Sequence, residues 1–159
     1  IAIDLDLRKA SLSQYAGRPK KGISDYLAGD VKDIKDVIVK PSGDAKIDLI
    51  PVGTVPPNPT ELLFSERLEQ LITDLRAEYD YIFIDCPPSL ELLTLNALCA
   101  ADEILIPVQC EYYALEGLSD LMMTMRAVKR RLNPTLGIFG VIVYKFDSFK
   151  LVHVDYLYF

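Results

Sequence analysis

Three aspartates stand out because each lies at or just beyond the end of an apolar run. "IAID" places Asp4 at the end of one run, with Asp6 two residues later, and "YDYIFID" places Asp85 at the end of another. Two prolines follow the second run and prevent the strand from continuing. In open α/β sheets, ligands bind at the carboxyl ends of the strands. The three carboxylates are therefore candidates for a metal or phosphate site, and the alternative is that they only cap turns.

These residue types favour magnesium and phosphoryl transfer. If both strands are central and parallel, their acids share one edge of the sheet and can hold a hydrated Mg²⁺ between them. Two or three carboxylates without a histidine cluster suit magnesium better than zinc. A carboxylate near the γ-phosphate can orient or deprotonate an attacking hydroxyl, and Arg8 can offset the phosphate charge.

Alternating strand and helix patterns predict how these acids are positioned. The run at 82–84 lacks polar alternation, which is typical of a strand covered on both faces. Regular alternation of strands and helices predicts βαβ crossovers and an α/β fold with a doubly wound, mostly parallel sheet. The expected strands are 1–4, 46–53, 82–85, 103–108 and 137–143, and the expected helices are 24–28, 61–78, 89–100 and 114–133.

Composition limits the class of protein. The chain has 159 residues, half of them apolar, which is the size of one domain with a substantial core. A formal net charge of -6 argues against the whole chain being drawn to nucleic acid or anionic lipid. No apolar run approaches the ~20 residues of a membrane span. Three cysteines without CxxC spacing favour a reducing compartment, so we expect a cytoplasmic protein.

The last sixteen residues differ from the rest. Residues 144–159 contain six of the fifteen aromatic residues and show neither a turn signal nor a helical period. We therefore expect a single domain over 1–143, followed by an atypical aromatic tail. Tyr156 and Tyr158 in this tail are candidate phospho-acceptors, against the alternative that they pack on a sheet edge or a partner.

The first half resembles one known family. The stretches "IAIDLDLRKASLSQYAG", "GISDYLAGD", "IDLIPVGTVPPNPTELLFSERL" and "YDYIFIDCPP" are similar to the cytoplasmic kinase domain of bacterial tyrosine autokinases that control capsule and exopolysaccharide export. This resemblance covers about residues 1–88. It implies a P-loop protein with a second acidic motif of the form DxD after a strand.

The second half resembles a related family. From Asp85 onward, "DCPPSLELLTLNALCAADEILIPVQCEYYALEGL" and the sequence up to about residue 143 are similar to ParA-type partition ATPases. The two families share a three-layer, deviant-Walker P-loop NTPase fold of the MinD/ParA-like kind. The chain therefore resembles two relatives that are joined at a shared element.

The resemblance implies roles for individual residues. Asp4 matches the acid that positions the nucleophile and supports the bound Mg·ATP, and Asp85 matches the Walker B acid that holds the water shell of Mg²⁺. Asp6 and Arg8 match the kinase form of the DxD motif, with Asp4, Asp6 and Arg8 as catalytic residues. Asp85 and Asp6 are the expected metal-binding pair.

The sequence also departs from both families. It contains no GxxxxGK[ST] motif, whose backbone and lysine hold the β- and γ-phosphates. In both families that loop lies just upstream of the Asp4 strand, so we expect the chain, which begins at Ile1, to be an incomplete domain from a longer protein. Relatives commonly carry an adenine-reading Asn near the last strand, where this sequence has Tyr144 and Lys145.

The leading expectation is the catalytic core of a tyrosine autokinase, using ATP and Mg²⁺, with Asp4 as base or orienting group. The alternatives are a ParA-type ATPase in plasmid or chromosome partitioning, with water as nucleophile, and an inactive truncated remnant. A homo-oligomer is expected for the intact protein. The further partners are a membrane-anchored activator at the cytoplasmic face of the inner membrane for a kinase, or DNA and a partition partner for a ParA-type protein.

Overall fold

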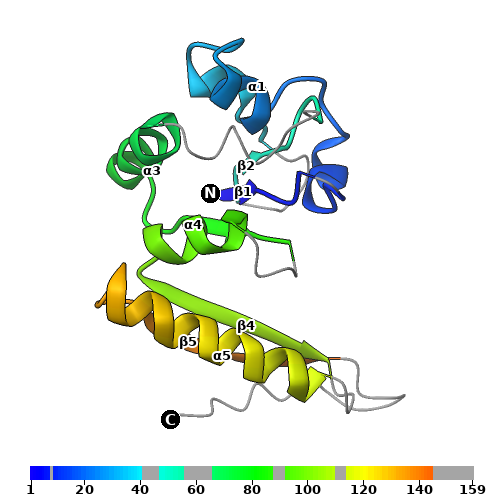
Figure 1. Cartoon of the computed structure of the whole chain (residues 1–159). Coiled ribbons are helices and arrows are strands. Elements are labelled where there is room, and N and C mark those ends of the chain that lie inside the picture. Colours follow the sequence, from blue (N-terminus) through cyan, green and yellow to red (C-terminus); the bar gives the residue numbers. More distant parts are fainter. Residues whose placement is uncertain (8, 41–46, 56–65, 88–91, 110–113, 145–159) are drawn as a thin grey trace. The chain divides into compact units, whose positions relative to one another are not determined.

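The computed structural model describes residues 1–7, 9–40, 47–55, 66–87, 92–109 and 114–144 (Figure 1). The chain forms two compact units, Ile1–Ala97 and Leu98–Phe159. Among the described residues, every helix is too short or too polar to cross a lipid bilayer.

A three-stranded parallel sheet forms the centre of the first unit. Its strands are β1 (Ala2–Asp4), β2 (Leu49–Ile50) and β3 (Phe83–Asp85), in the order β2-β1-β3. In the register, Ala2 lies opposite both Leu49 and Phe83, so β1 is the central strand. The three strands predicted for this half are therefore present and parallel, although β2 is much shorter than the predicted 46–53.

Helices connect these strands. The described helices are the 3-10 helices η1 (Leu12–Ala16) and η2 (Ile34–Val37) and the α-helices α1 (Ile23–Ala28) and α3 (Glu66–Glu78). Glycines end η1 and α1, because Gly17 and Gly29 adopt left-handed φ angles of 75° and 91°. The η2 turn was not predicted, and the Asp33 side chain caps it by accepting a hydrogen bond from the Lys35 amide at 2.9 Å.

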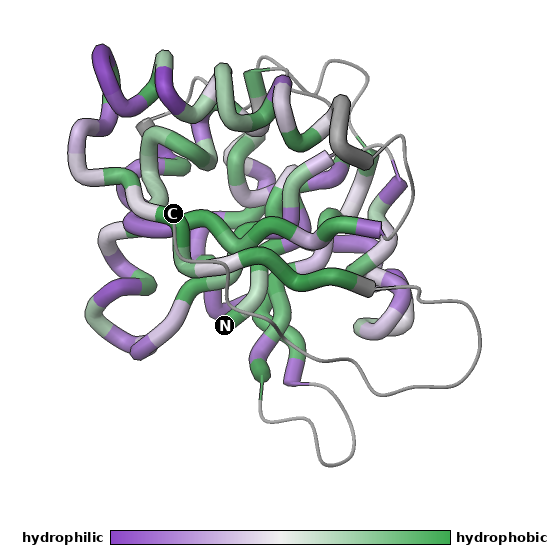
Figure 2. Tube along the Cα trace, turned by 90° about the horizontal axis from the view of Figure 1, so that it is seen from below, coloured by the Kyte–Doolittle hydropathy of each residue, from purple (hydrophilic) through white to green (hydrophobic). Residues whose placement is uncertain are grey.

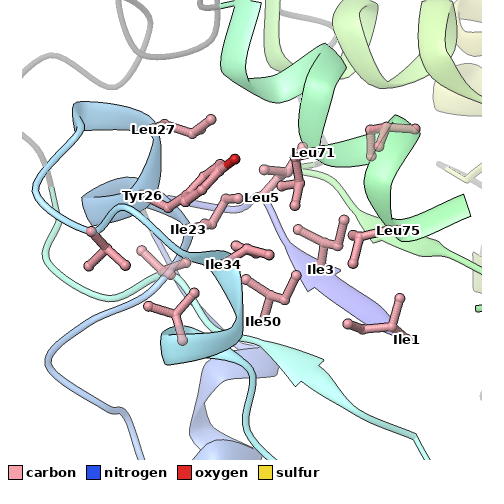
Figure 3. Close-up of a cluster of buried hydrophobic side chains, with 14 of the residues drawn as sticks. Ile1, Ile3, Leu5, Ile23, Tyr26, Leu27, Ile34, Ile50, Leu71 and Leu75 are labelled. Atoms are coloured by element: carbon pink, nitrogen blue, oxygen red, sulfur yellow. The ribbon is translucent and has the colours of Figure 1, made fainter. Parts of the chain in front are cut away.

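The hydrophobic core of this unit lies on one face of the sheet. Ile1, Ile3 and Leu5 alternate along β1 and its extension, so their side chains point to the same face. Side chains from α1, η2 and α3 pack against them, including Tyr26, Ile34 and Leu71 (Figure 3). Each fully buried Leu or Ile contributes about 1.5–3 kcal/mol relative to an exposed one. This packing fixes the position of β1 and therefore of the acid at its end.

The opposite face of β3 differs from the prediction. Tyr81 is 73% exposed and Phe83 is 51% exposed, whereas the sequence predicted a strand covered on both faces. The reason is that the core helices α1, η2 and α3 pack on the side that carries Ile3, whereas Phe83 is paired with Ala2 and faces the other side.

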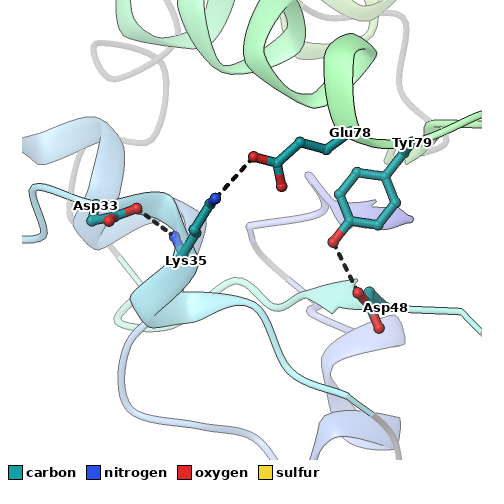
Figure 4. Close-up of polar contacts among 5 residues, drawn as sticks. All are labelled: Asp33, Lys35, Asp48, Glu78 and Tyr79. Atoms are coloured by element: carbon teal, nitrogen blue, oxygen red, sulfur yellow. Dashed lines mark hydrogen bonds and ion pairs between the residues drawn. The ribbon is translucent and has the colours of Figure 1, made fainter.

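Two polar contacts join segments near the amino-terminal ends of the strands (Figure 4). Tyr79, just before β3, donates its hydroxyl to Asp48 Oδ2 at 2.8 Å, and burial together with this bond raises the pKa of Tyr79 to about 12. Lys35 of η2 and Glu78 of α3 form an ion pair at 2.9 Å. Since both side chains of that pair are more than half exposed, the ion pair contributes little to stability.

The second unit contains a parallel strand pair. β4 (Glu103–Gln109) pairs with β5 (Gly137–Tyr144), with a register shift after Ile104, and α5 (Ala114–Arg131) packs against β4. The two strands run side by side as mostly hydrophobic segments (Figure 2). This β4-α5-β5 arrangement is the βαβ unit that the sequence predicted.

A buried asparagine closes the turn between α4 (Leu92–Ala100) and β4. The Asn133 side-chain nitrogen lies at 3.1 Å from the Leu98 carbonyl oxygen, 3.2 Å from that of Cys99 and 2.8 Å from that of Ala101. These carbonyls lie at a helix end and have few intrahelical donors, so the asparagine serves as a remote C-terminal cap.

Candidate functional site

The site lies at the carboxyl edge of the three-stranded sheet. Asp4 ends β1 and Asp85 ends β3, and the two residues are direct register partners in neighbouring parallel strands. Neighbouring strands are about 4.8 Å apart, and partners in a parallel pair project to the same face. The Leu5 amide also donates to the Asp85 carbonyl at 2.9 Å, so the pairing continues past both acids. The structure therefore brings the two acids together at one edge.

Asp4 is fully buried and strongly hydrogen-bonded. Its Oδ2 accepts from the Ser13 amide and the Ser13 hydroxyl, both at 2.7 Å, and its Oδ1 accepts from the Asp6 amide at 3.1 Å. Its exposed fraction is 0%. Asp4 is thus held in one orientation by the loop and by η1.

Ser13 connects Asp4 to β2. Its hydroxyl accepts a hydrogen bond from the Val52 amide at 2.8 Å while donating to Asp4, and its side chain is 3% exposed. Sequence reasoning missed this residue. The available signal was weak, because a serine nine positions after an acid in "SLSQ" follows no spacing rule that predicts a contact.

The other DxD acid lies beside Asp4. Asp6 is 8% exposed, and its Oδ1 accepts from the Lys9 amide at 3.1 Å, which shapes the turn after β1. Arg8, predicted to offset phosphate charge, lies outside the described residues, as do Tyr156 and Tyr158.

Asp85 is the accessible acid of the three. Its side chain is exposed, yet its pKa is raised above the ordinary value of 3.8, first by desolvation and then by the negative charges of Asp4 and Asp6. The charges of Asp4 and Asp6 therefore act on Asp85. A neighbouring thiol, Cys86, has its pKa raised to about 12, mainly by burial, and is therefore unreactive at neutral pH.

A shallow cavity lies in front of Asp85. It has a volume of about 550 Å³ and is lined by residues of η1 and its start together with the aspartate: Ser11, Leu12, Gln14, Tyr15 and Asp85. This volume is within the range of small-ligand sites. None of these lining side chains is cationic, so they do not by themselves provide a phosphate site.

The acids fit a magnesium ion that arrives with a nucleotide. Within the described part of the chain, no group of three or more His, Cys, Asp or Glu side chains forms a complete metal site. Magnesium bound with phosphates needs only one or two protein carboxylates, because phosphate oxygens and water complete its shell. A cation beside Asp85 would also offset the desolvation and the like charges that raise its pKa. Asp85 and Asp6 are the residues that would hold it.

Comparison with known proteins assigns the family. The AAA_31 family model, described as an AAA domain, matches residues 1–138. The chain belongs to the AAA_31 family.

Two curated relatives of this AAA_31 chain are a chromosome partitioning protein and a sporulation initiation inhibitor protein. It is 63% identical over 82 residues to the chromosome partitioning protein ParA of Myxococcus xanthus, covering 52% of this chain and 29% of that protein. It is 44% identical over 153 residues to the sporulation initiation inhibitor protein Soj of Bacillus subtilis, covering 91% of this chain and 55% of that protein. The chain thus spans less than two thirds of the length of either relative.

Solved structures with a similar fold include several nucleotide complexes. Cobyrinic acid a,c-diamide synthase from Mycobacterium smegmatis, with a bound ATP analog and magnesium, has a TM-score of 0.74 and 28% identity, covering 89% of this chain and 59% of that one. MinD from Pyrococcus horikoshii, complexed with Mg-ADP, has a TM-score of 0.68 and 28% identity, covering 89% of this chain and 56% of that one. The BceF tyrosine kinase domain has a TM-score of 0.69 and 26% identity, covering 86% of this chain and 54% of that one.

These comparisons support both resemblances seen in the sequence. ParA and Soj are sequence relatives, and tyrosine kinase domains and MinD are structural neighbours. The fold is α/β with parallel sheets, of the MinD/ParA-like P-loop NTPase class, as predicted. The roles of Asp4, Asp6 and Asp85 stay predictions.

Proposed function

We propose that this chain is part of a magnesium-dependent ATPase or ATP-dependent kinase that transfers the γ-phosphoryl group of ATP. The observation that carries the proposal is the register pairing of Asp4 with Asp85 at the carboxyl edge of the sheet, with Asp6 close enough for its charge to act on Asp85. This edge is where open α/β sheets bind ligands. ATP and Mg²⁺ are the proposed ligands, and a phosphate-binding loop would lie upstream of β1.

The three acids at the sheet edge have different proposed roles. Asp85, which is accessible, and Asp6 would hold the water shell of the metal, whereas Asp4 is buried and bonded through both oxygens. When bound, the metal would neutralise charge on the β- and γ-phosphates. Asp4 therefore contributes to the site by fixing the geometry of the loop that follows β1.

Water is the first candidate acceptor of the γ-phosphoryl group. The ParA and Soj relatives are 63% and 44% identical over their matched segments, and the Soj match covers 91% of the chain. A partition-type ATPase that works as a homo-oligomer in the cytoplasm, with DNA and a partition protein as partners, follows from this similarity as a proposal.

A tyrosine hydroxyl is the second candidate acceptor. The observation that favours it is the "DLDLRK" form of the acidic motif, together with a structural neighbour that is a tyrosine kinase domain at 26% identity. In that case Tyr156 and Tyr158 are the proposed acceptors, and a membrane-anchored activator is the proposed partner.

Labelled ATP separates the two acceptors. We would add the upstream strand and phosphate-binding loop of Bacillus subtilis Soj before Ile1 and incubate this extended chain with γ-labelled ATP and Mg²⁺. Label released as free phosphate and stimulated by DNA indicates the ATPase. Label retained on protein tyrosine, and lost in a Tyr156→Phe and Tyr158→Phe variant, indicates the kinase.

The matched control is Asp85→Asn, which should remove magnesium-dependent turnover in either case. A thermal melt of each chain shows whether it is folded. The proposal fails if the folded, extended chain neither binds nor turns over Mg·ATP.

A further inference from the structure

We infer that Ser13 is a positioning residue that fastens η1 to the carboxyl edge of the sheet, so that η1 forms the wall of the cavity facing Asp85. The inference deepens the proposed function and rests on it for the role of that cavity. The residue types alone do not indicate this role of Ser13, because the role depends on where its buried hydroxyl lies.

The Ser13 hydroxyl joins three segments. It donates to Asp4 at the end of β1, accepts from the Val52 amide just after β2, and belongs to η1. The Ser13 amide adds a second bond to the same Asp4 oxygen. With 3% of the side chain exposed, these bonds are shielded from water, which strengthens them.

The location of Ser13 relative to the cavity is specific. Of the five consecutive residues 11–15, four line the cavity with Asp85: Ser11, Leu12, Gln14 and Tyr15. Ser13 is buried behind them and bonded to the sheet. Among the described residues, Ser13 therefore attaches this wall to the strand end next to Asp85.

Asp4 is the other half of the anchor. A carboxylate offers about four acceptor positions, two on each oxygen. In the described part of the chain, two donors from Ser13 occupy Oδ2 and the Asp6 amide occupies one position on Oδ1. Asp4 is thus the acceptor that holds Ser13 and the loop after β1 at the strand end.

Ser24 provides a matched control. It is also buried, at 2% exposed, and its hydroxyl also bonds to residue 52, but to the Val52 carbonyl at 2.7 Å. Within the described part of the chain, the Ser24 hydroxyl bonds to the Val52 and Thr54 carbonyls and to neither Asp4 nor the residues that line the cavity. Ser24→Ala should therefore cost stability without releasing η1.

Amide hydrogen exchange on the 159-residue chain tests the anchor directly. Gly17 and Arg18 donate their amides back to Gln14 and Ser13 carbonyls, so their exchange reports on η1. We expect Ser13→Ala to speed exchange at both amides at least tenfold beyond its effect on α3, Ser13→Thr to restore most of the protection, and Ser24→Ala to change η1 and α3 alike. A uniform increase across η1 and α3 in Ser13→Ala would overturn the inference, because it would indicate only global destabilisation.

Manganese binding then tests the link to the site. With Mn²⁺ as an electron-paramagnetic probe, we expect Ser13→Ala to weaken binding at least fivefold and Ser24→Ala less than twofold. Equal weakening in the two variants would contradict the link between the anchor and Asp85. If the unmodified chain binds no Mn²⁺ while the exchange result holds, the metal part of the proposed function fails and the anchor stands.

Discussion

Two aspartates at the same register level have different environments. Asp4 is 0% exposed and accepts three hydrogen bonds, whereas Asp85 is exposed and has a raised pKa. Desolvation and nearby like charges both disfavour the ionised form of a carboxylate, and both act on Asp85. The edge therefore combines one fixed acid with one acid whose charge is unfavourable until a cation neutralises it.

This difference predicts how Asp85 affects stability with pH. Since its folded-state pKa is raised, its contribution is present below the ordinary pKa of 3.8 and is lost as pH rises through the raised pKa. Asp85→Asn removes that loss, so the variant should melt at a higher temperature than the unmodified chain at pH 7, and the difference should vanish below about pH 4. Thermal melts from pH 3 to 8 in a chelator would measure this. If Asp85→Asn were less stable than the unmodified chain at pH 7, that result would contradict the raised pKa of Asp85.

At the residue scale, the sequence predicted the positions of the acids better than their bonding. Strand ends are readable because apolar runs stop at Asp4 and Asp85. The bonds of Asp4 to Ser13 depend on how the chain folds back after β1, and no local pattern encodes that path.

Among the elements, the turn before α1 and the turn after β2 meet at a close backbone approach. Gly53 has a φ of 80°, and a methyl group there would overlap Asp25 Oδ2 and the Gly22 amide nitrogen. Asp25 Oδ2 accepts from the amides of Gly22, at 2.8 Å, and Thr54, at 3.1 Å. Glycine is required here both for the backbone angle and for space.

Gly53→Ala and Gly17→Ala separate these two requirements. Gly17 has a similar φ of 75°, but nothing lies within 4 Å of a methyl group built there. We expect Gly17→Ala to lower the free energy of unfolding by about 1–2 kcal/mol from backbone strain alone. Gly53→Ala should cost about 1–3 kcal/mol more, because the overlap adds to the strain. Urea unfolding of both variants measures the difference, and equal costs would argue against the close approach.

Element types were predictable where the pattern was long. The helical period predicted α3 and α5, and their described parts end within two residues of the predicted ends at 78 and 133. The predicted strand 46–53 is observed only as Leu49–Ile50, and its carboxyl end is at Pro51, which has no amide hydrogen to donate to a ladder. The η2 turn was missed because four residues are too few for a period to show.

For the whole molecule, the structure has two compact units, with the boundary between Ala97 and Leu98 inside α4. The sequence placed the change from kinase-like to ParA-like residues near Asp85, about a dozen residues earlier. The prediction of one domain over 1–143 stays a prediction.

Hydrogen exchange can show whether the two units open separately. Leu71 of α3 is 0% exposed in the core of the first unit, so Leu71→Ala should cost about 2–5 kcal/mol there. If the units are separate cooperative blocks, the amides of β1 and α3 should exchange faster while those of β4 and β5 keep their protection. Faster exchange in all four elements would indicate one cooperative block instead.

The order of the strands in the first sheet affects how the protein is made. β1 is the central strand, yet it precedes both of its neighbours in the chain. A ribosome adds about 5–20 residues per second, so β1 emerges seconds before the residues of β3 are synthesised. During that interval its apolar side chains and free ladder groups lack native partners. The β1 segment is therefore a candidate site for chaperone binding during protein synthesis.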